Sequence, residues 1–317
     1  MCCRRGVSAV LVISLLNLAG SNPVLAQHPI DVERSAAQAE YFKALVTFEK
    51  LPARRATSEA VIAAAKSAWA LGLAERAIKE YDRALRDESL SPLQRARLLL
   101  SRGIIEYQEG RYQVAALFAE KGIKCLNEES PLKAQIWLLW AESLIKLNSY
   151  GAAEEKYLKA VSQAHSEEKG EIYFLLAQCQ LRLGKLKEAR LSFEQVPLSH
   201  DRAAAAMRHL AEIALEEGRF DQASFWLQKG REEFPNSFLD SWVDYALVQA
   251  AIYKNDRRRV EQLQKNAEQK YPPSDSWLIL LNAAAEAFYW SESARAMPRN
   301  EALAVSTAQE VDRAGGL

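Results

Sequence analysis

The chain has 317 residues, 49% of them hydrophobic and 9% aromatic, and its 41 Lys and Arg balance 41 Asp and Glu. That much apolar material can build a core and argues against global disorder, while a net charge of zero gives no basis for a nucleic-acid-binding surface. Four Cys and four His are too few and too scattered for a zinc framework, and an Ala-rich chain with only 13 Gly and 10 Pro favours helices.

Residues 1–26 have the pattern of a secretory signal. Arg4 and Arg5 form a short positive segment, residues 7–18 are largely apolar, and small residues precede the expected cleavage after Ala26. Cleavage predicts a periplasmic or secreted protein. The alternative is an uncleaved signal that anchors the chain in the inner membrane, although spanning a bilayer takes about 20 apolar residues.

Six loop signals recur along the chain at a nearly constant spacing. The Gly or Asn in each accepts the left-handed conformation that ends many helices, and successive markers lie 38, 38, 36, 34 and 37 residues apart. Each marker therefore predicts the end of one helix and the start of a second within a few residues. The markers are Gly72, Gly110, Asn148, Gly184, Gly218 and Asn255.

The residues around the markers repeat as well. A small residue stands seven positions before and five positions after each marker, with Val in its place around the last one, and this predicts closely approaching helices. Nine positions after the marker most residues are large and apolar, as expected for contacts between successive pairs. The small residues are Ala65, Gly103, Ala141, Ala177, Ala211 and Val248 before the markers, and Ala77, Ala115, Ala153, Ala189, Ala223 and Val260 after them. The later positions are Tyr81, Ala119, Tyr157, Phe193, Leu227 and Gln264.

This pattern resembles the tetratricopeptide repeat, a pair of helices of 34 residues with a Gly-x-Tyr turn, an Ala-x-x-x-Phe second helix and a closing Pro. Residues 230–237 add a closing turn similar to those of exported bacterial members of the family from the cell envelope. The resemblance implies an all-α fold, a right-handed α-solenoid of about six stacked helix-turn-helix repeats with a capping C-terminal helix.

Five parts are expected along the chain. They are a signal peptide (1–26), a leading helix or partial repeat (27–56), the repeat solenoid (57–273), a capping helix (274–297) and a flexible tail (298–317).

Signal cleavage decides which cysteines remain. Cys2 and Cys3 leave with the signal, and the mature chain keeps Cys125 and Cys179. An oxidising compartment allows a disulfide, but the two residues fall more than one repeat apart, and a bridge requires Cα atoms within about 7 Å. We therefore expect two buried or half-buried thiols.

The resemblance implies a concave face made mostly by the first helix of each pair. Counting back from the markers places aromatic, aliphatic, amide and charged side chains on that face, a mixture that suits a bound peptide segment. For any single aromatic residue, such as Trp69, Tyr107 or Phe174, we expect packing between repeats, and we expect a binding surface of the set as a whole. The candidate partner-binding residues are Lys66, Trp69, Tyr107, Glu142, Phe174, Gln178, Arg208, Trp242, Tyr245 and Gln249.

The sequence contains no pattern that indicates catalysis, a cofactor or a metal. Its four His share no metal-ligand spacing, and it has neither a Gly-rich phosphate loop nor a nucleophile elbow. The basic cluster at residues 257–259 is typical of a solvated turn. We therefore predict no enzyme activity, no cofactor, no nucleic-acid partner and only indirect contact with a membrane.

These observations predict a non-catalytic scaffold or adaptor of the bacterial cell envelope that binds a protein or peptide segment of an envelope complex in its concave groove. One alternative is an accessory helical scaffold of a peptidoglycan-processing enzyme, similar to that of soluble lytic transglycosylases, although only 44 residues follow Pro273. Another is a self-associating structural component that uses the apolar helix at residues 276–290. The oligomeric state stays open.

Overall fold

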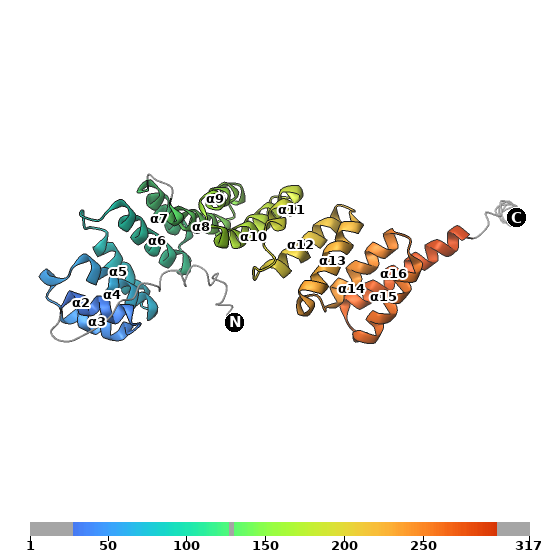
Figure 1. Cartoon of the computed structure of the whole chain (residues 1–317), viewed down its shortest axis with the longest axis horizontal. Coiled ribbons are helices and arrows are strands. Elements are labelled where there is room, and N and C mark those ends of the chain that lie inside the picture. The colour runs from blue at the N-terminus through green and yellow to red at the C-terminus, as the bar shows by residue number, and fades with distance from the viewer. Residues whose placement is uncertain (1–27, 127–129, 297–317) are drawn as a thin grey trace, which may run out of the picture. The chain divides into compact units, whose positions relative to one another are not determined.

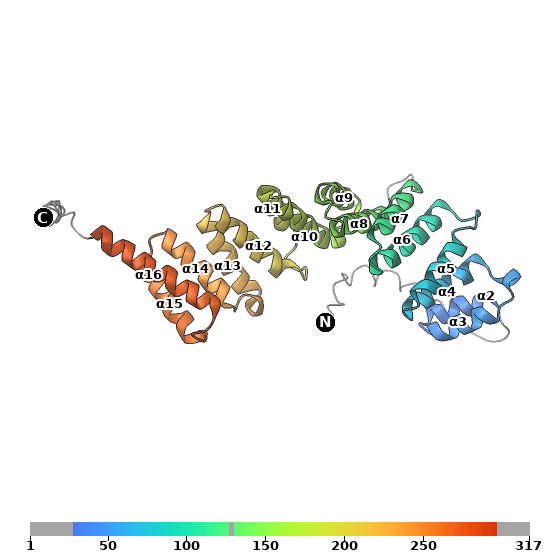
Figure 2. The ribbon, with the colours of Figure 1, turned by 180° about the vertical axis from the view of Figure 1, so that it is seen from behind.

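The computed structural model describes residues 28–126 and 130–296, and every regular element in these ranges is a helix. The prediction of an all-α fold built from the helical hairpins of a solenoid is confirmed (Figures 1 and 2). The chain divides into two compact units, of which the first ends at Arg202 and the second begins at Ala203. The expected signal peptide and C-terminal tail lie outside the described residues.

Five hairpins of a first and a second helix make up the described part of unit 1. Within each hairpin the two helices pack along each other, and each hairpin packs on the next. The first helices are α2 (Pro29–Ala37), α4 (Ser58–Ala70), α6 (Pro92–Gln108), α8 (Pro131–Lys146) and α10 (Ser166–Arg182). The second helices are α3 (Tyr41–Lys50), α5 (Ala74–Ala84), α7 (Tyr112–Lys124), α9 (Tyr150–Gln163) and α11 (Leu186–Glu194), and the short helix η1 (Ala53–Arg55) follows α3.

Unit 2 continues the same pattern and ends in a longer helix that packs against α14 and α15. The turn predicted at residues 230–237 follows α13. The buried ring of Phe238 fixes it, because this ring lies so close to Gly230 that an added Cβ would fall 2.3 Å from a ring carbon. The elements are α12 (Ala203–Glu216), α13 (Phe220–Glu233), η2 (Pro235–Ser237), α14 (Ser241–Tyr253), α15 (Arg257–Lys270) and α16 (Ser276–Ala296).

All six predicted markers end a first helix in the left-handed conformation, with φ between 55° and 79°. At Gly110, for example, the Gly110 N–H donates to the carbonyl of Tyr107 at 3.1 Å and the next N–H donates to Glu106 at 2.8 Å, the paired bonds of a Schellman turn. The prediction of helix ends at the markers is therefore confirmed.

A seventh turn of this kind joins α2 to α3 and has no Gly or Asn. Ala39 adopts φ of 60°, a conformation that costs an L-residue about 1–2 kcal/mol, and Glu40 N–H donates to the carbonyl of Ser35 at 2.8 Å. Because Ala is not a typical residue for this turn, the sequence does not mark the hairpin of α2 and α3.

The small residues around the markers lie where the helices of a hairpin meet. Each of the eleven that has a side chain is fully buried, with 0% exposure. Gly103 on α6 faces α7 and α8, because an added Cβ would lie 3.4 Å from the carbonyl oxygen of Ala115 and 2.8 Å from Cδ2 of Leu139. Small side chains thus allow the close approach that the sequence pattern predicted.

Cys125 and Cys179, the two cysteines in the described part of the chain, have the burial that the sequence predicted. Cys125 is half-buried at the end of α7, and Cys179 is buried on α10, where its Sγ donates to the carbonyl oxygen of Tyr150 at 3.3 Å. Burial raises the pKa of the Cys179 thiol to about 11, so this thiol is protonated at neutral pH.

Replacing Gly110 with Ala tests the turn. No heavy atom lies within 4 Å of an added Cβ, so Gly110→Ala changes only the backbone strain, and we expect a loss of about 1 kcal/mol. The matched control Gly151→Ala also places its Cβ in open space but lies within α9 without a positive φ, so it should be neutral or slightly stabilising. Urea unfolding followed by circular dichroism measures both, and equal shifts would contradict the strain argument.

Candidate binding surface

Each first helix that ends at one of the six markers carries a stripe of side chains at three, six, ten and thirteen residues before the marker. This spacing keeps them on one side of an α-helix. In unit 1 the stripes of α6 and α8 meet, because the hydroxyl of Tyr107 donates to Oε2 of Glu142 at 2.9 Å. The stripes of α6 and α8 thus lie side by side. We call the first-helix stripes of unit 1 together the first-helix face of unit 1.

Tyr107 and Glu142 occupy the middle of this face. Tyr107 is only 6% exposed, and Glu142 is half-buried. Burial raises the pKa of the Glu142 carboxyl above its usual 4.5, and although the Tyr107 hydrogen bond works against this change, it does not reverse it. Burial also raises the pKa of Tyr107, and the neighbouring Glu142 raises it further.

Phe174 lies on α10 beneath an ion pair. Arg202 donates from Nε and Nη2 to the two carboxylate oxygens of Glu171 at 3.1 and 3.3 Å, and its guanidinium carbon lies 5.3 Å from the centre of the Phe174 ring. Phe174 is 4% exposed and meets Phe193 edge to face. For Phe174, as for Tyr107, the structure favours packing between helices over direct contact with a partner, because little of either side chain reaches the surface.

Three other predicted residues of unit 1 do reach the surface. Lys66 and Gln178 are exposed, and Trp69 is half-buried against the core of α2 to α5. Although Lys66 is exposed, the protein around its ammonium group partly desolvates it, and this lowers the pKa of Lys66. The positive charge of nearby Arg97 lowers the pKa further. Lys66 and Arg97 therefore form a positive corner of the first-helix face.

Unit 2 has its own first-helix face, which is rich in aromatic side chains. Arg208 on α12 donates to Asp240 and, at 2.8 Å, to the carbonyl of Ser237, and its guanidinium carbon lies 4.8 Å from the ring centre of Trp242. Tyr245 contacts Trp277 of α16 with their ring centres 5.2 Å apart. The predicted residues of unit 2, Arg208, Trp242, Tyr245 and Gln249, are all half-buried.

The sequence prediction missed four residues of these faces. Arg97 and Glu171 stand thirteen positions before their markers, the place that Trp242 holds in the last repeat, so the same count applied to every repeat would have found them. Trp277 follows the last marker, and Arg202 lies in the turn that precedes α12, so neither can be counted from a marker.

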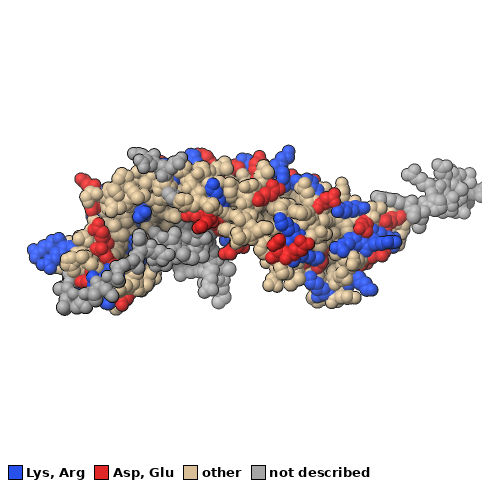
Figure 3. All heavy atoms as spheres, in the orientation of Figure 1, with Lys and Arg blue, Asp and Glu red and all other residues tan. Residues whose placement is uncertain are grey.

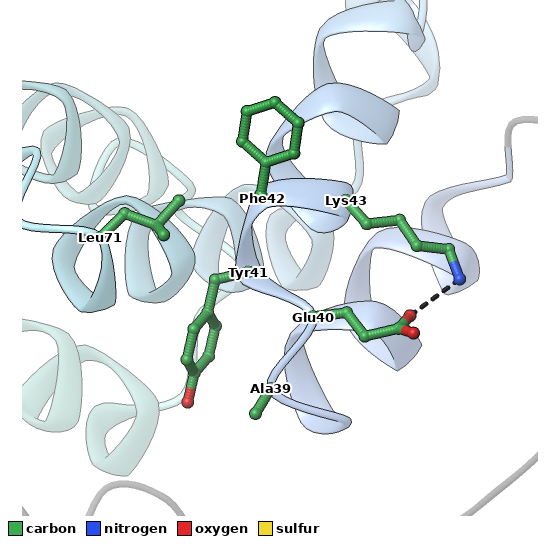
Figure 4. Close-up of a pocket in the computed structure, with 6 residues that line it drawn as sticks. All are labelled: Ala39, Glu40, Tyr41, Phe42, Lys43 and Leu71. Carbon is green, nitrogen blue, oxygen red and sulfur yellow. Dashed lines mark hydrogen bonds and ion pairs between the residues drawn. The ribbon is translucent and has the colours of Figure 1, made fainter.

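A wide hollow of about 410 Å³ lies at the helix corners of unit 1, between the start of α3 and the end of α4 (Figure 4). Its side chains diverge: Tyr41 and Phe42 point to different sides, and Lys43 pairs with Glu40 at 2.8 Å. The described residues of the chain include no group of three or more His, Cys, Asp or Glu placed to hold a metal ion. No helix within the described ranges is long and apolar enough to span a bilayer.

The family model of the tetratricopeptide repeat matches residues 62–133 and 138–199. Among solved structures, the C-terminal part of a TPR repeat-containing protein from Cytophaga hutchinsonii is similar, with a TM-score of 0.65 and 12% identity over 80% of this chain and 99% of that one. The Pseudomonas aeruginosa protein pilF is similar with a TM-score of 0.50 and 15% identity over 66% and 96%. At these identities the likeness shows the fold alone. No curated protein matches the chain.

The raised pKa of Glu142 predicts how stability depends on pH. The folded protein holds a proton on Glu142 that the unfolded chain releases above about pH 4.5, so this carboxyl lowers stability as the pH rises through its folded-state pKa. Glu142→Gln keeps an acceptor for Tyr107 and removes the titration. We therefore expect the variant to lose less stability than the natural protein when the pH is raised from 4.5 to about 7.5. Thermal unfolding followed by circular dichroism at the two pH values measures it.

Glu155→Gln is a control of opposite sign. Hydrogen bonds and ion pairs with Lys159 and Lys156 lower the pKa of Glu155 to about 2, so its contribution to stability is present above about pH 4.5 and is lost as the pH falls toward 2. A Glu142→Gln variant with the pH profile of the natural protein would show that Glu142 titrates normally.

Proposed function

We propose that this chain, whose residues 62–133 and 138–199 match the family model of the tetratricopeptide repeat, is a non-catalytic scaffold or adaptor that holds a segment of a partner protein on its first-helix faces. Proteins built from such repeats generally bind protein or peptide partners. The observation that carries the proposal is the row of half-buried Trp242 and Tyr245 and exposed Trp277 beside Arg208 in unit 2. Aromatic and Arg side chains of this kind dominate the energy of protein interfaces.

The two first-helix faces offer complementary contacts to such a segment. In unit 2 the aromatic rings provide apolar anchors, and the amide of Gln249 can bond to a peptide backbone. In unit 1 the exposed Lys66 and Gln178 offer a charge and an amide. Tyr107 and Phe174 support this surface from below.

We further propose that the protein works in the bacterial envelope, in the periplasm or after secretion. The positive start, apolar stretch and small residues of segment 1–26 support export. An envelope complex is then the source of the partner segment. The same sequence supports anchoring in the inner membrane if the signal is not cleaved.

Site-specific photo-crosslinking in the source cell tests binding and export together. A benzophenone side chain in place of Lys66, Gln178 or Gln249 should give adducts with a partner protein. Trp242→Ala should reduce the adduct at position 249 about tenfold, because an aromatic anchor is lost. The N-terminal sequence of the crosslinked chain should begin at Gln27.

Matched controls place the same benzophenone on exposed positions of second helices, at Gln113 of α7 and Lys187 of α11. Adducts formed equally well there would remove the first-helix faces from the proposal. A chain recovered from the cytoplasm with residues 1–26 intact would contradict export without bearing on the binding surface.

Self-association is a second candidate function, favoured by α16. One stripe of this helix, with Leu278, Leu281, Ala285 and Phe288, is buried. Another stripe of apolar residues within about 100° of the helix circumference is exposed. Along the helix, this exposed stripe begins with large side chains, continues with small ones and ends with a large one. An antiparallel second copy would therefore place Trp290 of one chain against Ile279 and Leu280 of the other. The exposed residues are Ile279, Leu280, Ala283, Ala287 and Trp290.

Light scattering of the mature chain measures this association. We expect a dimer at about 100 μM that Ile279→Glu with Trp290→Glu converts to a monomer, because each charge would be buried without a partner. The control pair Leu191→Glu with Phe225→Glu changes two residues that are each 54% exposed, as Ile279 is. It should leave the dimer intact. A natural chain that stays monomeric at this concentration would end this candidate.

A further inference from the structure

A second cavity of unit 1 lies away from the first-helix face. It has a volume of about 440 Å³ and is formed by the second helices α3 and α5 together with the segment around η1. Four basic residues line it, Arg76, Lys79 and Arg83 on α5 and Arg86 in the turn that follows α5. Figure 3 shows a group of Lys and Arg atoms at the left edge of the view, on the side where Figure 1 places α2 and α3.

The charges inside this α3–α5 cavity do not balance. Arg76 pairs with Glu49 at 3.2 Å and with Glu80 at 3.1 Å. The lining holds four basic and two acidic residues, which leaves it two positive charges in excess. Lys79 and Arg86 are exposed and form no ion pair with the described residues. An anionic ligand therefore meets two cations that no acid of the described chain neutralises.

The base of the cavity contains a buried acceptor without a donor. Glu80 is only 4% exposed, and its Oε2 accepts no hydrogen bond within the described chain. Nη1 of Arg83 lies 3.8 Å away, which suffices for electrostatic attraction but not for a hydrogen bond. A buried acceptor without a partner costs the protein stability, and more so when it is charged. A ligand with an N–H group would remove that cost.

The opposite wall of the cavity is apolar. Phe48, Leu51, Ala53 and Ala56 line it, and the guanidinium carbon of Arg83 lies 5.8 Å from the centre of the Phe48 ring. The cavity therefore combines an apolar wall, a basic rim and a buried acceptor.

We propose that the α3–α5 cavity binds an acidic peptide segment of a protein partner. The carboxylates of the segment pair with Lys79, Arg83 and Arg86, one of its backbone N–H groups donates to Oε2 of Glu80, and an apolar side chain packs on Ala53 and Ala56, the accessible part of the apolar wall. This site is separate from the first-helix faces and gives the scaffold a second point of attachment.

The buried acceptor favours a peptide over a phosphate group. A phosphate at neutral pH offers mainly acceptor oxygens, which Glu80 and Glu49 repel, whereas an extended peptide carries both carboxylates and backbone donors. The test must therefore distinguish binding of an acidic peptide from binding of a phosphate-bearing ligand.

Fluorescence anisotropy with the chain of residues 27–317 tests the site. The probe is a fluorescein-labelled decapeptide of Glu with Phe at every third position. We expect binding that Lys79→Glu with Arg86→Glu weakens by at least about tenfold, because two attractions become repulsions. An N-methylated version of the probe, which keeps its carboxylates but lacks backbone donors, should also bind more weakly.

The control variant Lys187→Glu with Lys265→Glu makes the same change of charge at exposed positions of other second helices, and should change binding less than about twofold. Equal weakening by both pairs, with circular dichroism showing both folded, would reduce the effect to net charge and overturn the proposal. Displacement of the probe by inorganic phosphate or by vesicles of phosphatidylglycerol at matching anion concentration would also overturn it. Neither result bears on crosslinking at the first-helix faces.

Discussion

The structure depends on one backbone constraint, the left-handed residue that ends each first helix. With φ near 55–79° this residue reverses the chain within three positions, so that the second helix begins at once and runs back along the first. The residue seven positions before the marker then meets the one five positions after it, as Gly103 meets Ala115. Both must be small, because two helix backbones that approach closely leave no space for larger side chains.

The close contact within hairpins determines where the larger side chains go. Tyr81, Tyr157 and Phe193 are at most 2% exposed and fill the space between successive hairpins. On the opposite side of the first helices, the residues that do not fit this core form the first-helix faces. Function is then a matter of which side chains the repeats place on these faces, because the repeats themselves supply only the support.

The first-helix faces and the α3–α5 cavity differ in chemistry. The face of unit 2 is aromatic, and its Arg208 is held by Asp240 and by a backbone carbonyl, so it offers apolar area with a fixed donor. The cavity carries exposed cations around a buried carboxylate. Each surface therefore suits a different kind of segment, an apolar one on the face of unit 2 and an acidic one in the cavity of unit 1.

The sequence by itself determined the hairpins, because a Gly or Asn at a left-handed turn and small residues at fixed distances from it are local requirements. It placed all six markers correctly, and it placed Lys66 and Gln178 at the surface. Tertiary structure decided how deeply Tyr107 and Phe174 are buried, because their burial depends on Glu142 and Phe193 from other helices and on Arg202 from the turn before α12. It also decided the α2–α3 turn at Ala39 and the α3–α5 cavity, since strain at an Ala and an unbonded oxygen of Glu80 arise only once separate segments have packed together.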